Sequence, residues 1–170
     1  DLLWGYGSMQ RWTGGTSAAP DGMTLAGAGA AMARSATVPN QMAYSGQMTS
    51  GGSAAASLSR SVTQYAQYNE MTASFYGWIR SNTASRVTLQ VTDGVTTKTS
   101  DALVPTNTWY EVGPGKDINL DALTISANPT ELTASLNISA GSAVVAIASD
   151  LRLILGGRNL QRYELPATNG

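Results

Sequence analysis

Residues 71–80 read Met-Thr-Ala-Ser-Phe-Tyr-Gly-Trp-Ile-Arg, and this stretch decides the fold. Apolar side chains, including Phe75 and Ile79, fall on one parity, whereas Tyr76, Trp78 and Arg80 fall on the other. Alternate residues of a β-strand point to opposite faces of its sheet, so the pattern predicts a strand with one face against a core. The other face carries two aromatic rings and a guanidinium spaced about 7 Å apart, which suits a sugar ring or a partner surface.

The same alternation recurs along the chain. Glycine-rich and serine-rich turns separate apolar-alternating runs, and Asp93-Gly94 is typical of a tight hairpin turn. This rhythm predicts an all-β sandwich or barrel. We expect strands at 2–12, 23–26, 31–36, 41–48, 54–63, 71–80, 85–92, 95–100, 109–112, 131–139 and 144–155.

The composition narrows the function classes. The 170 residues fit one domain, and only 12% are charged, about half the usual share. The polar surface is therefore built mainly from Ser, Thr, Asn, Gln and Gly. The ten basic residues are scattered singly and the net charge is −1, which argues against a nucleic-acid partner.

Several kinds of chemistry lack their usual residues. The chain has no cysteine and no histidine, which excludes disulfides and thiolate metal sites and removes the commonest general base. No two carboxylates are tied by spacing, and five aspartates fall in predicted turns, so we expect no enzyme activity; these are Asp21, Asp93, Asp101, Asp117 and Asp121. No apolar run approaches 18 residues, so no membrane insertion is expected. Because the chain begins at Asp1 with no Met and no basic-plus-apolar leader, we expect either a processed or excised piece of a longer polypeptide or a chain numbered after cleavage.

Six short motifs follow one another between about residues 5 and 155. They are Gly-Ser-Met-Gln-Arg-Trp at 7–12, Pro-Asp-Gly-Met at 20–23, Leu-Ser-Arg-Ser-Val at 58–62, Ala-Ser-Phe-Tyr-Gly-Trp-Ile-Arg at 73–80, Thr-Trp at 108–109 and Ala-Ser-Asp-Leu-Arg-Leu at 148–153. In this order they resemble the motifs of jelly-roll carbohydrate-binding modules, which occur on glycan-degrading enzymes and on bacteriophage tail-fibre or virion-surface proteins.

The resemblance implies a fold and a role. The fold is a two-sheet antiparallel β-sandwich, a jelly roll, over residues 1–156, followed by a C-terminal arm or linker at 157–170. The role is non-catalytic, with saccharide bound on a concave sheet face. The resemblance also implies one structural calcium held by Gln10 and Asp150. The family has a glutamate where this chain has Gln10, and losing that charge weakens a calcium site.

The second departure from the family is Arg60, which stands where a glutamine is common. It shares its parity with Leu58 and Val62, so strict alternation turns it inward, where an unpaired charge is costly. Three explanations remain open: a partner carboxylate, a bulge in the strand, or a ligand groove.

We expect Tyr76, Trp78, Arg80, Arg60, Gln90 and Trp109 to form the face that binds a glycan or a partner. The plainer alternative is that a loop covers Trp78, which then only extends the core. Trp109 could face outward or pack under a loop, and Trp12 is expected in the core. Trp4 and Tyr6 are candidates for docking on a neighbouring domain or subunit.

The expected function is adhesion by a module of an extracellular or virion-surface protein. Its partners are glycans or neighbouring protein subunits, and homo-oligomerisation is compatible with that role. The alternative is a purely structural virion subunit, a capsid-decoration or fibre domain, whose aromatic face and terminal arms bind protein neighbours. An accessory module of a secreted glycan-degrading enzyme is a third interpretation.

Overall fold

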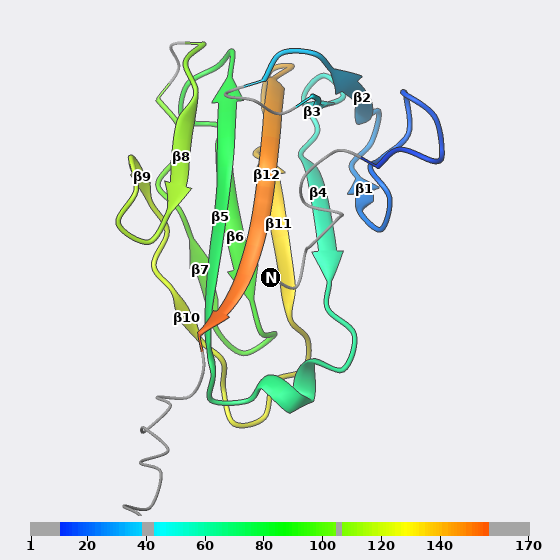
Figure 1. Ribbon diagram of the computed structural model, residues 1–170. Helices are drawn as coiled ribbons and strands as arrows, with labels where there is room; N and C mark the ends of the chain where they lie inside the picture. The colour runs from blue at the N-terminus through cyan, green and yellow to red at the C-terminus, as the bar shows by residue number, and fades with distance from the viewer. Residues whose placement is uncertain (1–10, 39–42, 105–106, 157–170) are drawn as a thin grey trace, which may run out of the picture.

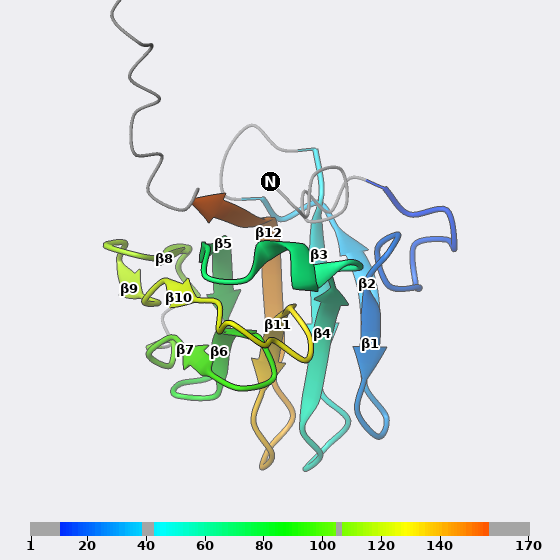
Figure 2. The ribbon, with the colours of Figure 1, turned by 90° about the horizontal axis from the view of Figure 1, so that it is seen from below.

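Two β-sheets lie face to face in the structure, a computed structural model that describes residues 11–38, 43–104 and 107–156 (Figure 1). A view turned by 90° shows the two sheets from another side (Figure 2). Within the described ranges the one helix is a 3₁₀ turn, Tyr65–Tyr68. No described helix has the length and apolarity to cross a membrane. The all-β, two-sheet sandwich predicted from the sequence is confirmed.

The five-stranded sheet has the order β1-β4-β11-β6-β7, and all its pairs are antiparallel. Its strands are β1 (Thr24–Ala26), β4 (Ala56–Ser61), β11 (Thr133–Ile138), β6 (Val87–Thr92) and β7 (Thr97–Thr99).

The seven-stranded sheet has the order β2-β3-β12-β5-β8-β9, with β10 paired to β5. Its strands are β2 (Ala31–Ser35), β3 (Ser45–Thr49), β12 (Val145–Gly156), β5 (Thr72–Ser81), β8 (Tyr110–Gly113), β9 (Ile118–Asn119) and β10 (Leu123–Thr124). Among the strand pairs of the described ranges, the β8–β9 pair alone is parallel.

Most predicted strands appear, with ends that differ by at most four residues. The exceptions are 2–12, whose first nine residues lie outside the described residues and whose last two are not in a strand, and the short β9 and β10, which were not predicted. A two-residue strand carries no periodicity, and its pairing depends on the neighbouring strand.

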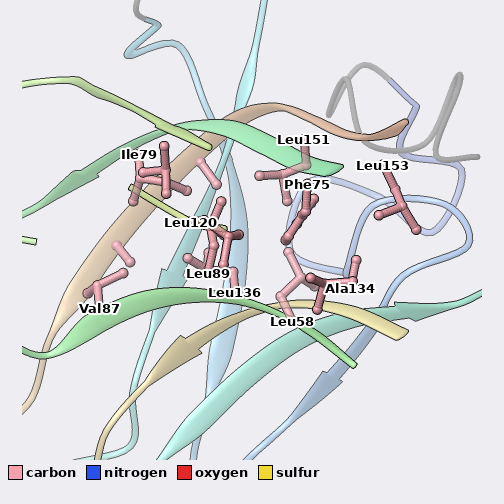
Figure 3. Packing of buried hydrophobic residues seen from close by; sticks show 14 of the residues in the cluster. Leu58, Phe75, Ile79, Val87, Leu89, Leu120, Ala134, Leu136, Leu151 and Leu153 are labelled. Carbon is pink, nitrogen blue, oxygen red and sulfur yellow. The ribbon is translucent and has the colours of Figure 1, made fainter. Parts of the chain in front are cut away.

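The core lies between the sheets. Leu58, Leu136 and Leu89 stand opposite one another on three neighbouring strands, and each is almost completely buried. Phe75 and Leu153 oppose them from the other sheet (Figure 3). Burying one such side chain stabilises the fold by roughly 1.5–3 kcal/mol. Trp12, expected in the core, is partly buried and packs against this cluster.

The Asp93-Gly94 turn joins β6 to β7, as predicted. The buried Asp93 carboxylate accepts bonds from the backbone amides of Val95 at 2.9 Å, Thr96 at 2.6 Å and Ser126 at 2.7 Å. Burial raises the pKa of Asp93, but these bonds outweigh it and leave the pKa below its ordinary value. The side chain therefore fixes the hairpin and ties it to the loop before β11.

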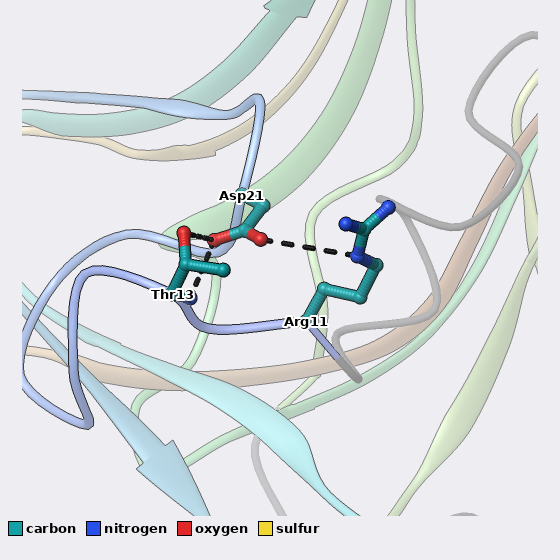
Figure 4. Close-up of polar contacts among 3 residues, drawn as sticks. All are labelled: Arg11, Thr13 and Asp21. Carbon is teal, nitrogen blue, oxygen red and sulfur yellow. Dashed lines mark hydrogen bonds and ion pairs between the residues drawn. The ribbon is translucent and has the colours of Figure 1, made fainter.

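A second carboxylate anchors the loop before β1. Asp21 accepts bonds from the backbone amide of Thr13 at 2.7 Å and from its hydroxyl at 2.8 Å, and Arg11 Nε lies 3.9 Å from the other oxygen (Figure 4). The pKa of Asp21 lies below its ordinary value, mainly because these two hydrogen bonds from Thr13 stabilise the ionised carboxylate. The Pro-Asp-Gly-Met motif at 20–23 therefore has a structural role, because its aspartate fixes the loop before β1.

Candidate ligand-binding face

The outer parity of β5 forms the centre of the candidate site. Tyr76, Trp78 and Arg80 are each half-buried on this parity, while Phe75, Gly77 and Ile79 are buried on the other. Their neighbours on β12 are Arg152, Ser149 and Ile147 respectively, and Glu111 of β8 lies beside Trp78. We call the surface formed by these seven outer residues the aromatic face.

A β-bulge in β12 shapes this face. The register between β12 and β5 shifts between Ser149 and Arg152, and Asp150 has a φ of 51°. The extra residue lets Leu151 turn into the core while Arg152 returns to the outer face. Gly77 leaves room for that Leu, because a Cβ built there would lie 2.4 Å from Leu151 Cδ2.

Tyr76 lies against the backbone of β8. A Cβ built on Gly113 would stand 2.3 Å from the Tyr76 ring, and Gly113 has a φ of 153°, so only glycine fits this contact. The ring borders a pocket of about 220 Å³, whose other lining residues are Glu111, Lys116, Arg152 and Ile154.

The charges at this pocket are paired. Lys116 Nζ lies 3.0 Å from Glu111 Oε2, and Arg152 Nε lies 3.1 Å from Asp150 Oδ2. Burial raises the pKa of Asp150, Arg152 opposes the rise, and the charge of Glu111 adds to it. The two ion pairs at this pocket therefore offer both hydrogen-bond donors and acceptors to a ligand near the Tyr76 ring.

Trp109 belongs with the aromatic face. It immediately precedes β8, is half-buried and shares the parity of Glu111. Extending the β5–β8 register by one residue places Trp109 opposite Arg80. Of the residues expected to bind, Tyr76, Trp78, Arg80 and Trp109 thus lie together.

Gln90 and Arg60 do not lie on the aromatic face, so the prediction that they share one face with Tyr76 and Trp78 was wrong. Gln90 lies on β6, on the outer surface of the other sheet, where its amide donates to Thr99 Oγ1 at 3.2 Å. Arg60 stands on the inner parity opposite Ala134, in unbroken register, and its Nη1 donates to the Gly22 carbonyl at 2.8 Å. The regular register excludes the bulge. Both residues have the parity expected from alternation, but their strands belong to the five-stranded sheet and not to the sheet that carries the aromatic face.

The sequence did not reveal Arg152, Ser149, Glu111 or Lys116 as members of the site. Strict alternation from Ser149 turns Arg152 inward, and only the bulge turns it out again. Glu111 could have been found, because it shares its parity with Trp109.

The implied calcium site stays a prediction. Gln10 lies outside the described residues, and Asp150 ion-pairs with Arg152. Within the described ranges, no three side chains among His, Cys, Asp and Glu gather where they could hold a metal ion. The described residues therefore do not by themselves fit a calcium site.

Comparison of structures places the fold among β-sandwich carbohydrate-binding modules. A xylan-binding domain of a Paenibacillus barcinonensis xylanase matches with a TM-score of 0.59 and 14% identity, over 88% of this chain and 91% of that one. A family 61 module bound to β-1,4-galactotriose matches with a TM-score of 0.57 and 10% identity, over 80% and 90%.

A larger Clostridium thermocellum xylanase fragment, bound to xylohexaose, matches with a TM-score of 0.54 and 14% identity, over 82% of this chain and 27% of that one. The chain thus spans nearly all of the isolated modules but about a quarter of the enzyme fragment. At these identities the likeness establishes the fold. Comparison of the sequence with protein-family models and with curated proteins finds no match.

Proposed function

We propose that this chain is a non-catalytic glycan-binding module and that the aromatic face holds the saccharide. The observation that carries the proposal is the gathering of Tyr76, Trp78 and Trp109 with paired charges on the outer surface of one sheet. Aromatic rings stack on the apolar faces of sugar rings, and a few placed polar groups fix the orientation. The described strands of the opposite sheet carry no aromatic side chain.

The solved structures support the same proposal. Two of the similar structures hold β-1,4-galactotriose or xylohexaose, and a third is a xylan-binding domain. Those ligands belong to those proteins, but the shared fold makes a saccharide the first ligand class to test. The surface of this chain, poor in charge and rich in hydroxyl and amide groups, suits such an uncharged, hydrogen-bonding environment.

The binding mechanism is stacking combined with hydrogen bonding. Trp78 lies at the centre of the face, and the Glu111–Lys116 and Asp150–Arg152 pairs offer acceptors and donors to hydroxyl groups near Tyr76. A single site of this kind binds weakly, so repeated copies on an extracellular or virion surface would give useful avidity. Display of that kind, including a homo-oligomer, is part of the proposal.

The test compares one substitution on each outer surface. Trp78→Ala removes the central ring, and Gln90→Ala is the matched control on the other sheet. We expect the intact protein to bind on a glycan array, Trp78→Ala to lose about tenfold or more in affinity by calorimetry, and Gln90→Ala to bind normally. Circular dichroism melting should show both variants folded.

Two results would contradict the proposal. One is a Trp78→Ala variant that binds saccharide as tightly as the intact protein. The other is an intact protein that binds no glycan and forms an oligomer that dissociates when residues 157–170 are deleted, which would select the structural virion subunit instead.

A further inference from the structure

Arg80 has no hydrogen-bond or ion-pair partner in the described part of the chain, and it is the one described arginine in that position. Each of the others has a partner. Arg11 and Arg152 pair with carboxylates, Arg60 and Arg86 donate to backbone carbonyls, and Arg34 lies over the Tyr44 ring.

The position of Arg80 makes the lack of a partner energetically unfavourable. Its Nε atom is buried without an acceptor, and its neighbour on β12 is the buried Ile147. A guanidinium does not give up its charge in a protein, and an unpaired charge against an apolar neighbour is unfavourable. A ligand that supplies the missing acceptor relieves that cost, and the same surroundings strengthen the pairing.

Among the described residues, the pocket beside Arg80 is lined by hydrogen-bond donors and by no carboxylate. A pocket of about 140 Å³ lies beside it, with Thr37, Asn82 and Asn107 among its lining residues. The Asn82 side-chain oxygen already accepts bonds from Val145 N and Thr83 Oγ1, both at 2.9 Å, which leaves the Nδ2 amide group as a donor. A guanidinium flanked by amide donors is the arrangement that receives an oxyanion, because its fork matches two oxygen atoms at once.

The opposite end of the aromatic face differs in charge. Around Tyr76, the carboxylates of Glu111 and Asp150 are neutralised by Lys116 and Arg152. Tyr76 and Arg80 lie four positions apart along β5, a distance of about 13 Å. One extended ligand can therefore meet a balanced end at Tyr76 and an uncompensated positive charge at Arg80.

We propose that the ligand of the aromatic face is an acidic saccharide whose carboxylate or sulfate group pairs with Arg80. This inference rests on the proposed glycan-binding function and names the class of glycan. Trp78 and Trp109 would hold the sugar rings on either side of that contact, and Asn82 would donate to the same anionic group.

The test uses an array of paired glycans in which each acidic member stands beside its neutral counterpart. Oligogalacturonate is paired with its methyl ester, and sulfated galactan with the desulfated polymer, so that the two arms separate carboxylate from sulfate. We expect the intact protein to bind at least one acidic member about tenfold more tightly than its neutral partner at low salt. Added sodium chloride should reduce the preference.

Three variants test whether Arg80 causes the preference for acidic over neutral glycans. Arg80→Gln should bind the acidic and neutral members equally, and Arg80→Lys should keep part of the preference because it keeps the charge but loses the fork. Lys98→Gln removes one positive charge from β7 on the other sheet, and it should keep the full preference.

Binding of neutral members alone, or with equal affinity, would overturn the inference and leave the proposed function standing. Retention of the full preference by Arg80→Gln would also overturn it. Binding of no member at all would overturn the proposed function itself. The comparison within the intact protein requires no variant to fold.

Discussion

The two sheets have similar inner surfaces and very different outer ones. The outer surface of the five-stranded sheet is a polar array whose middle row crosses all its strands as Thr24, Ser59, Ser135, Gln90 and Thr99. Side chains of this surface bond one another, such as Gln90 to Thr99 at 3.2 Å. The aromatic face carries rings instead, together with Arg80, which has no partner in the part of the chain that the structure describes.

This difference separates the residues that stabilise the fold from the residues that we propose bind a ligand. Apolar residues on the inner parity are enough for a sandwich, and the outer parity is free to vary. Hydroxyls that satisfy one another need no ligand, whereas half-buried rings, and a cation without an acceptor among the described residues, are completed by one.

Two aspartates show the same contrast. Burial acts against the ionised form of both, but the pKa of Asp93 ends below its ordinary value because backbone amides surround it. The pKa of Asp150 ends above its ordinary value, since Arg152 does not offset burial and the charge of Glu111. Asp93 stabilises the hairpin of the five-stranded sheet, while Asp150 costs stability on the aromatic face.

The largest expected effect is on stability, from Asp93→Ala. The change leaves three backbone amides without their acceptor, and we expect a loss of roughly 3 kcal/mol in the free energy of unfolding. Urea denaturation at neutral pH measures it. A loss below about 0.5 kcal/mol, the size typical of a surface substitution, would contradict the structural role of this turn.

The same residue makes a prediction about pH. Since the folded-state pKa of Asp93 lies below 3.8, its contribution is present above that pH and is lost as the pH falls toward the folded value. Stability of the intact protein should therefore fall below about pH 4 more steeply than that of Asp93→Asn. Parallel curves for the two proteins would be inconsistent with this assignment.

An intermediate effect is expected from Gly113→Ala, which acts on the aromatic face. The added methyl group collides with the Tyr76 ring, so the ring must move, and its position beside the pocket is lost. We expect roughly 1–3 kcal/mol of destabilisation and weaker glycan binding. Gly115→Ala is the control, because a Cβ there meets nothing within 4 Å although its φ of 68° is also strained. Equal glycan affinity in the two variants would show that Tyr76 does not take part in binding.

The smallest effect is expected from Asp150→Asn. Asparagine tolerates the φ of 51°, and it removes a carboxylate whose ionised form is disfavoured in the folded state. Stability at neutral pH should stay equal or rise slightly, and the gain should disappear as the pH falls through the raised folded-state pKa. Thermal melting between pH 3 and 7 measures the difference. A clear loss at neutral pH would show that the ion pair with Arg152 dominates.

The sequence predicted the parts of the fold that depend on local alternation and turn chemistry. Residues 71–80 lie in or next to β5, with the expected parity, and Asp93-Gly94 forms the expected hairpin. In both cases the signal is a repeat of two residues or a pair of turn residues, which needs no information about distant strands.

The site was predicted only in part, because its other members depend on long-range pairing. Nothing local to Gln90 shows that its strand joins the five-stranded sheet beside β11. The bulge at Asp150 has no periodic signature, yet it decides that Arg152 faces outward. The Arg60 contact with Gly22 joins residues that lie 38 positions apart.

The most direct test of the central claim is amide chemical-shift mapping of the isotope-labelled protein during titration with the tightest glycan from the array. We expect shifts concentrated at Tyr76, Trp78 and Arg80 of β5, at Glu111 of β8 and around the bulge of β12, with the signals of Ser59, Ser135 and Gln90 unchanged. Shifts concentrated on the five-stranded sheet, with the aromatic face unchanged, would contradict it.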